Sequence, residues 1–136
     1  MRYDLYPGAA VFLDWGLLLL RLVAAGVFFA SGLGHVKAPQ ERAKSLGLPV
    51  PFTIFLGWAE MLGAFGIAFG VLTQWAAQGL ILIMGGAIYM KAVRWKTGFW
   101  GEKNSGWHYD LLFVAMCVVI FLSDGGRLTL MRLFLR

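Results

Sequence analysis

Four long apolar runs, separated by polar stretches, dominate the pattern of this chain. A helix needs roughly 20 apolar residues to cross the hydrocarbon core of a bilayer, and each run comes close to that length. The pattern therefore predicts four membrane-spanning helices. Their expected bounds are about 15–36, 54–73, 76–93 and 107–123.

The connections between these helices differ in length and polarity. In the first, Pro39 followed by QERAKSLG predicts a short surface helix that Gly47 ends, because proline suits a helix start and glycine its stop. Gln74 and Trp75 are expected to form a tight turn between the second and third helices. The tail 127–136 alternates apolar residues with arginines and is too short to span, which favours an interfacial segment.

Composition strengthens the membrane interpretation. Hydrophobic residues make up 60% of the chain and charged residues 14%, with a mean hydropathy of +0.72. Soluble domains are nearer 45–50% apolar and about 25% charged. We therefore expect an all-α, integral membrane four-helix bundle with a short interfacial helix in the first loop, forming a single domain over residues 1–136 within a lipid bilayer.

Two residue classes support membrane-spanning helices that pack closely together. All six tryptophans lie near predicted helix ends, where an interfacial aromatic belt is expected. Small residues recur along two helices and predict faces where neighbouring helices approach closely. These are Gly26, Ala30 and Gly34 in the first helix, and Ala59, Gly63, Gly66 and Gly70 in the second. Such faces also suit other membrane or redox subunits as partners, or a homo-oligomer.

The net charge of +5 bears on orientation. The cations lie between and after the apolar runs, which indicates anionic headgroups as their partners and not nucleic acid. Seven lie near the long connections, namely Lys37, Arg42, Lys44, Lys91, Arg94, Lys96 and Lys103, against Arg2, Arg127, Arg132 and Arg136 on the other side. This excess narrowly favours long connections in the cytoplasm and both termini outside. We expect the membrane to be a bacterial or archaeal cytoplasmic membrane.

Polar residues from all four helices are predicted at one end of the bundle. Glu60 lies about 9 Å below the long-connection face, at a rise of 1.5 Å per residue. An ionisable residue inside a spanning helix is costly and indicates a functional site or a buried pair. If their side chains point inward, these residues form a polar basket with a carboxylate at its floor. The candidates are Glu60, His35, Lys37, Lys91, His108 and Asp110.

Arg21 enters from the opposite face, at a depth of roughly 10 Å. It is a candidate intramembrane partner for Glu60, although both side chains would have to extend; Gln78 and Asp124 are alternatives. Such a pair would lock the first helix against the second. The competing interpretation is that these charges contact a ligand head group or a proton.

No established cofactor or catalytic motif is present in the sequence. His35, His108, Glu60 and Asp110 are residue types that bind iron or zinc, but no motif such as HExxH orders them, and we assign no metal site and no catalytic residue. Cys117 is the one cysteine, which excludes a Cys-x-x-Cys thiol oxidase. Tyr89, Trp107 and Tyr109 lie near the basket and could flank a quinone ring, although an aromatic belt also explains them.

Several segments in order resemble the DoxX family of small four-helix membrane proteins, over about Leu17 to Leu130. They are LLLLRLVAAGVFF, SGLGHVKAP, GLPVPFTIFLGWAEMLGAFGIAFGVLTQWAA and DGGRLTL. The marks include an arginine in the first helix, the G-x-x-E of Gly57 and Glu60, and the Gly-Gly-Arg after the fourth helix. Two positions depart from the family: Ser31 stands where members often carry a histidine, and His108-Tyr109-Asp110 where they often have Glu-Tyr.

The resemblance implies a quinone-linked membrane subunit, since the family name comes from small subunits of a quinol oxidase and a thiosulfate:quinone oxidoreductase. Three functions follow as hypotheses. The first is an accessory or anchor subunit of a quinone-linked respiratory complex. The second is a stand-alone binder or carrier of a small amphipathic molecule such as a quinone, and the third is a structural or assembly protein without catalysis.

Overall fold

A computed structural model describes residues 6–101 and 106–134. Six α-helices follow the 3-10 turn η1 (Ala9–Phe12) in the described part, which contains no strand. They are α1 (Leu13–Lys37), α2 (Pro39–Leu46), α3 (Val50–Phe69), α4 (Thr73–Tyr89), which continues into the π-helical turn η2 (Met90–Arg94), α5 (His108–Ser123) and α6 (Leu130–Phe134). Arg2, Lys103 and Arg136, counted above for orientation, lie outside the described residues.

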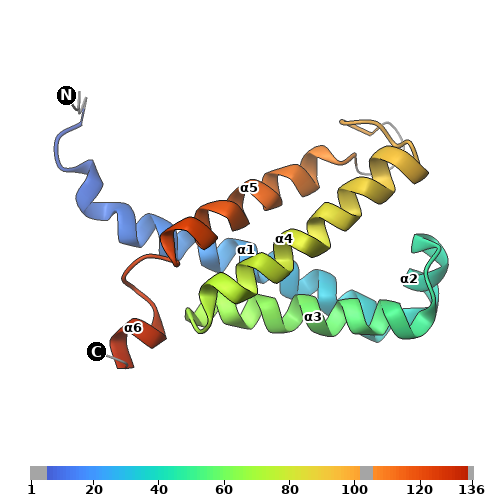
Figure 1. Ribbon diagram of the computed structural model, residues 1–136, viewed down its shortest axis with the longest axis horizontal. Coiled ribbons are helices and arrows are strands. Elements are labelled where there is room, and N and C mark those ends of the chain that lie inside the picture. Colours follow the sequence, from blue (N-terminus) through green and yellow to red (C-terminus); the bar gives the residue numbers. More distant parts are fainter. Residues whose placement is uncertain (1–5, 102–105, 135–136) are drawn as a thin grey trace.

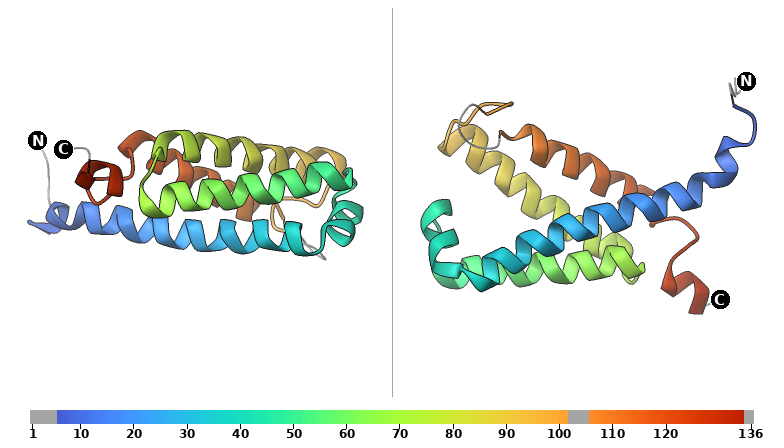
Figure 2. Two further views of the ribbon diagram at one scale, coloured as in Figure 1. Left: turned by 90° about the horizontal axis from the view of Figure 1, so that it is seen from below. Right: turned by 180° about the vertical axis from the view of Figure 1, so that it is seen from behind.

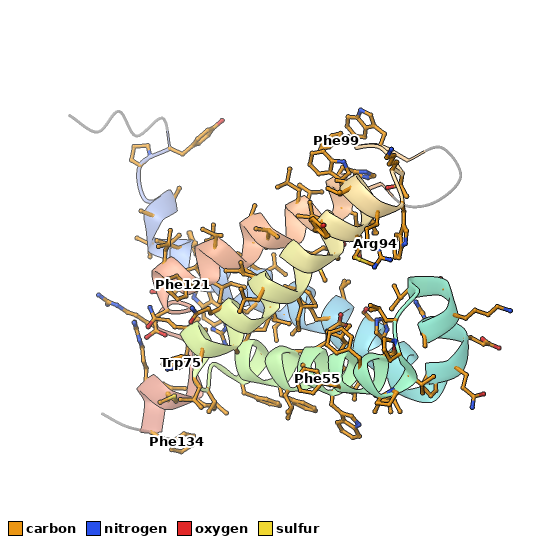
Figure 3. The ribbon with its side chains drawn as sticks, turned by 45° about the vertical axis from the view of Figure 1, so that its right-hand side comes forward. Phe55, Trp75, Arg94, Phe99, Phe121 and Phe134 are labelled. Carbon is orange, nitrogen blue, oxygen red and sulfur yellow. The ribbon has the colours of Figure 1, made fainter. Side chains whose placement is uncertain are left out.

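Three of these elements are long and apolar enough to cross a membrane: Ala9–Lys37, Val50–Phe69 and Thr73–Arg94. The helix α5 is apolar but shorter, at 16 residues. Large apolar side chains point outward from the helices, among them Phe55 and Trp75 (Figure 3). The predicted all-α membrane bundle with a short helix, α2, in the first connection is confirmed.

Both predicted bounds of the second helix are wrong by four residues, and the predicted start of the third, at 76, is three residues late. The second helix begins at Val50 and not at 54, because Pro51 falls in its first turn, where no backbone N–H is needed. It ends at Phe69, because Gly70 takes a left-handed conformation with φ of 72°. The turn is therefore Gly70–Leu72, and the predicted turn residues Gln74 and Trp75 lie inside α4.

The four long helices form two pairs, α1 with α3 and α4 with α5 (Figure 1). The pairs lie close together near the α3–α4 turn and diverge toward α2 and η2, so the bundle has the outline of a V (Figures 1 and 2). The core fills the closed part of the V and includes Phe28, Ile67, Leu80 and Ile120. The open part of the V lies at the long-connection end, where the polar basket was predicted.

The close approach of α1 to α3 uses a different row of small residues from the predicted one. A Cβ added at Gly57 would lie 2.7 Å from the carbonyl oxygen of Gly32, so the two helix backbones touch there. Gly26 and Ala30 are exposed. The predicted face of α3 does pack closely, because a Cβ at Gly63 would meet Leu80 and one at Gly66 would meet Ala76.

Candidate functional site

The closed end of the V is organised around the buried guanidinium of Arg21, which is 1% exposed. Its Nε and Nη2 donate to the carbonyl oxygens of Ile67 and Ala68, at 2.7 and 3.0 Å. Its Nη1 donates to those of Gly125 and Leu128, at 3.0 and 2.7 Å. The last carbonyls of a helix lack partners within it, so a cation at the end of α3 is favourable there.

The Gly-Gly-Arg sequence after α5 forms the other wall of this arginine site. Gly125 has a φ of +77°, and a Cβ there would lie 3.1 Å from Cδ of Arg21. A Cβ on Gly126 would lie 3.1 Å from Oδ1 of Asp14, which accepts the backbone N–H of Arg127 at 2.9 Å. Arg21 and the Gly-Gly-Arg sequence both contribute to the family resemblance. They therefore form one structural contact that holds the helices together.

The predicted pair between Arg21 and Glu60 is not formed. Arg21 donates to four backbone carbonyls instead, and no ion pair joins it to Glu60 in the described part of the chain. Ile67, which Arg21 contacts, lies seven residues beyond Glu60, or about 10 Å along the helix axis. Arg21 therefore belongs to the closed end of the V, and Glu60 to the open end. The alternative partner Asp124 contacts Arg132 at 3.4 Å.

The open end contains a cavity of about 430 Å³, which we call the wedge. Its lining comes from both arms of the V: α1 and α3 with the end of α2 on one side, α4 and η2 on the other. Most of the lining is apolar, from residues such as Leu56, Ile83 and Met84. A largely apolar cavity with a few polar groups is the usual form of a small-molecule site.

Three of the six basket candidates line the wedge: His35, Glu60 and Lys91. His35 and Glu60 are 8% and 3% exposed. Nδ1 of His35 and Oε2 of Glu60 are both buried, and neither has a hydrogen-bond partner within residues 6–101 and 106–134. Buried polar groups are normally paired, so two unpaired atoms on residues that line one cavity call for an explanation.

The G-x-x-E motif explains how the two polar groups come together. Because Gly57 has no side chain, α1 reaches the α3 backbone, and a Cβ at Gly57 would lie only 2.9 Å from Cβ of His35. Glu60 follows one turn later on the same helix, with the hydroxyl of Ser31 beside its carboxyl group. Sequence reasoning did not assign a role to Ser31, although its position one turn before His35 is visible in the sequence.

Lys91 and Asp110 form an ion pair on the opposite arm, with Nζ and Oδ2 separated by 2.8 Å. Their side chains are 18% and 6% exposed. The pair joins η2 to the start of α5, and Lys91 also lines the wedge. Lys91 lies in the π-helical turn η2, a rare geometry that is frequent at functional sites.

The remaining basket candidates lie elsewhere. Lys37 is exposed and does not line the wedge. His108 turns toward the second connection, where Nδ1 lies 2.8 Å from the carbonyl oxygen of Phe99 and its ring lies against Trp100. Among the aromatic candidates, Tyr89 lines the wedge, together with Phe52 and Trp95, which had not been singled out. In the described ranges no group of three or more His, Cys, Asp or Glu side chains is arranged to hold a metal ion.

Arg42 is a second residue that sequence reasoning counted only as surface charge. Its guanidinium lies over Gly34, where a Cβ would be 2.9 Å from Nη2. This position brings it within electrostatic range of both His35 and Glu60. An exposed cation of α2 thus lies near the unpaired polar wall of the wedge.

Comparisons with known proteins agree with this architecture. The sequence model of the DoxX family matches residues 16–92, which span α1 to the middle of η2. The chain is 27% identical to an uncharacterized protein of Haemophilus influenzae over 123 residues, covering 84% of this chain and 80% of that protein. No solved structure matches the chain. The family match covers more than half of the sequence, and this integral membrane protein belongs to the DoxX family.

Proposed function

We propose that this protein binds a small amphipathic molecule of the quinone class, with its polar ring in the wedge. The observation that carries the proposal is that two buried residues, Glu60 and His35, line an otherwise apolar cavity and that each has one polar atom, Oε2 and Nδ1, without a hydrogen-bond partner in the described part of the chain. An unpaired buried polar group destabilises a protein by about 1–3 kcal/mol. A ligand that supplies the missing partners would recover part of that energy.

A quinone ring suits this wall chemically. Its two carbonyl oxygens accept hydrogen bonds, whereas the hydroxyl groups of the reduced form also donate them. Carboxyl and imidazole groups can each act as donor or acceptor according to their protonation state, so Glu60 and His35 could serve either form. Phe52 and Trp95 supply aromatic faces in the same cavity.

The accessory-subunit hypothesis is compatible with this binding role. The family resemblance implies a quinone-linked complex, in which a separate redox subunit would exchange electrons with the bound quinone. The first turns of α1 favour such a partner, because α1 and η1 extend beyond the other helices at the closed end of the V (Figure 1). Large apolar side chains are exposed there, including Val11, Phe12 and Trp15.

We further infer a bacterial or archaeal cytoplasmic membrane as the location, with the long connections in the cytoplasm. Arg42, Lys44, Lys91, Arg94 and Lys96 all lie at the open end of the V. In this orientation the open end of the V faces the cytoplasm, and both termini lie outside.

Quinone binding can be tested on the purified protein in a mild detergent. We expect a decyl-tailed benzoquinone or naphthoquinone to raise the unfolding temperature, and the replacement Glu60→Gln to weaken that binding about tenfold, in keeping with the loss of one or more hydrogen bonds. The matched control is Glu41→Gln, on the exposed surface of α2. If no quinone stabilises the protein, or if Glu60→Gln binds as tightly as the control, the proposal fails.

Native co-purification separates the subunit from the stand-alone binder. The tagged protein is extracted from its own membranes, and the bound proteins and small molecules are identified by mass spectrometry. A stoichiometric redox protein would support the accessory-subunit role. Recovery of a monodisperse, quinone-loaded protein without a partner would support the stand-alone binder instead.

A further inference from the structure

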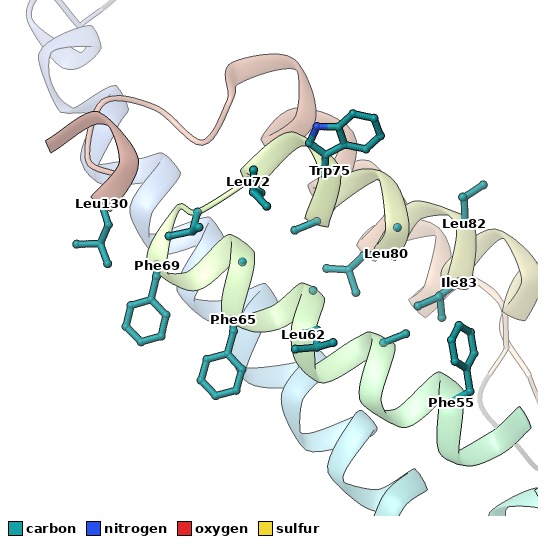
Figure 4. A pocket seen from close by; sticks show the side chains of 16 residues that line it. Phe55, Leu62, Phe65, Phe69, Leu72, Trp75, Leu80, Leu82, Ile83 and Leu130 are labelled. Atoms are coloured by element: carbon teal, nitrogen blue, oxygen red, sulfur yellow. The ribbon is translucent and has the colours of Figure 1, made fainter. Parts of the chain in front are cut away.

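The lipid-facing side of the bundle carries a second hollow, between α3 and α4 (Figure 4). This α3/α4 groove has a volume of about 890 Å³ and is lined by apolar residues and glycines, apart from the indole of Trp75. On α3 its lining runs from Phe55 to Phe69, or about 21 Å along the helix axis. Leu130 of α6 closes the end near the α3–α4 turn.

The α3/α4 groove meets the wedge. Leu82 and Ile83 of α4 line both hollows, and on α3 the neighbouring residues Phe55 and Leu56 line the groove and the wedge respectively. Glu60 and His35 line only the wedge. A polar compartment and a long apolar compartment therefore adjoin each other, and the apolar one faces the lipid.

We infer that the ligand of the wedge is a long-tailed lipid, such as an isoprenoid quinone, whose apolar tail lies in the α3/α4 groove while its ring lies beside Glu60 and His35. This inference rests on the proposed function and adds the class of ligand and its route. A tail in the groove remains in contact with the bilayer, so the ring reaches the wedge sideways from the membrane, past Leu82 and Ile83, without crossing water.

The two compartments match the two parts of an amphipathic ligand: the polar ring lies in the wedge and the apolar tail in the α3/α4 groove. Burying apolar area stabilises a complex by roughly 25 cal/mol per Å² when that area leaves water, but a lipid tail starts in an apolar environment. The groove therefore contributes mainly close packing against α3 and α4, as between helices in a membrane. The polar wall of the wedge supplies the hydrogen bonds that hydrocarbon cannot.

Three glycines of α4 allow these compartments to be filled separately. Gly79 lines the groove, Gly86 lines the wedge, and Gly85 lines neither. A Cβ added at any of the three meets nothing within 4 Å. Leucine is also a better helix former than glycine, so all three leucine variants should fold.

The experiment compares a decyl-tailed benzoquinone with the same ring carrying no tail, in nanodiscs of one lipid composition. Each affinity is expressed relative to the unsubstituted protein and is measured by quenching of tryptophan fluorescence. We expect Gly79→Leu to weaken the tailed quinone at least tenfold and the tail-less ring by no more than twofold. Gly86→Leu should weaken both at least tenfold, and Gly85→Leu should change neither by more than twofold.

The outcomes separate this inference from the proposed function. If Gly86→Leu weakens both quinones while Gly79→Leu acts no more strongly on the tailed one, ring binding stands and the tail inference is overturned. If Gly79→Leu instead changes the oligomeric mass in the nanodisc, the groove is a contact between copies of this chain, which also overturns it. If no variant affects either quinone, the proposed function itself fails.

Discussion

At the closed end of the V, the buried cation of Arg21 meets four carbonyl oxygens. At the open end, Glu60 and His35 are also buried, yet Oε2 and Nδ1 meet no hydrogen-bond partner among the residues that the structure describes. Both ends place ionisable groups within apolar helices, where each is expensive. The difference indicates two roles: a charge with four backbone hydrogen bonds holds the helices together, whereas buried groups that keep an unpaired atom beside a cavity are available to a ligand.

The largest effect is expected from removing the charge at the closed end. Arg21→Met should destabilise the protein on the order of 4 kcal/mol, because hydrogen bonds to a charged group contribute about 1.5–3 kcal/mol each and do not add fully. Thermal unfolding in detergent measures the loss. Arg21→Lys should retain only part of the stability, since one ammonium group cannot replace the planar guanidinium fork. An Arg21→Met variant as stable as the unsubstituted protein would contradict the structural role.

The ion pair between Lys91 and Asp110 is expected to have the next largest effect. Lys91→Met leaves the carboxylate of Asp110 unpaired at a nearly buried position, and we expect a loss of about 2 kcal/mol, less than for a fully buried pair because Lys91 is partly exposed. The double replacement Lys91→Met with Asp110→Leu should recover at least half of that loss in the same unfolding assay. Equal losses of unfolding free energy in the single and double variants would show that the Lys91–Asp110 ion pair does not stabilise the open end of the V.

A glycine comparison tests how tightly each end is packed. Gly125→Ala should destabilise the protein by about 1–2 kcal/mol, because alanine disfavours its φ of +77° and the new methyl group would crowd Arg21 and Thr73. Gly85→Ala, in open space on α4, should instead leave stability unchanged or raise it by up to about 1 kcal/mol. Similar unfolding temperatures for the two variants would remove the contrast in packing between them.

The smallest expected effect has the opposite sign to that of Arg21→Met. Glu60→Met removes a buried carboxyl group whose Oε2 has no partner in the described part of the chain, while keeping the approximate size of the side chain, so the unliganded protein should gain about 1 kcal/mol in unfolding free energy. Such gains at a binding site commonly accompany a loss of function. The exposed replacement Glu41→Met serves as the control, with no change expected. Destabilisation by Glu60→Met would place Glu60 among the structural residues with Arg21.

The helices were predictable because their signals are local. Apolar length located α1 to within two residues at each end, and α5 to within one. The bounds of α3 were less accurate, because the run from Ile54 to Thr73 stays apolar through the turn. Only the left-handed backbone at Gly70 and Leu72 shows where the chain reverses.

The sequence predicted how deep the candidate site residues lie in the bundle, but not the direction in which their side chains point. Counting residues placed His35, Glu60 and Lys91 at one end of the bundle, and the structure brings these three to one cavity. The same counting also placed Lys37 and His108 there, yet neither lines the cavity. The direction in which a side chain points depends on helix rotation and crossing, which spacing along one helix does not define.

The sequence alone determined the solvent and the architecture of this protein. Its apolar runs are too long and too numerous to be buried in a water-soluble fold. A bilayer can accommodate them as helices, because a helix satisfies its own backbone hydrogen bonds. Tertiary structure decided the surroundings of the two intramembrane charges, Arg21 and Glu60. The contact of Gly32 with Gly57 turned Glu60 and His35 toward the wedge, and the positive φ angles of Gly70 and Gly125 brought carbonyl oxygens around Arg21. These contacts join residues far apart in sequence, so no local pattern could have revealed them.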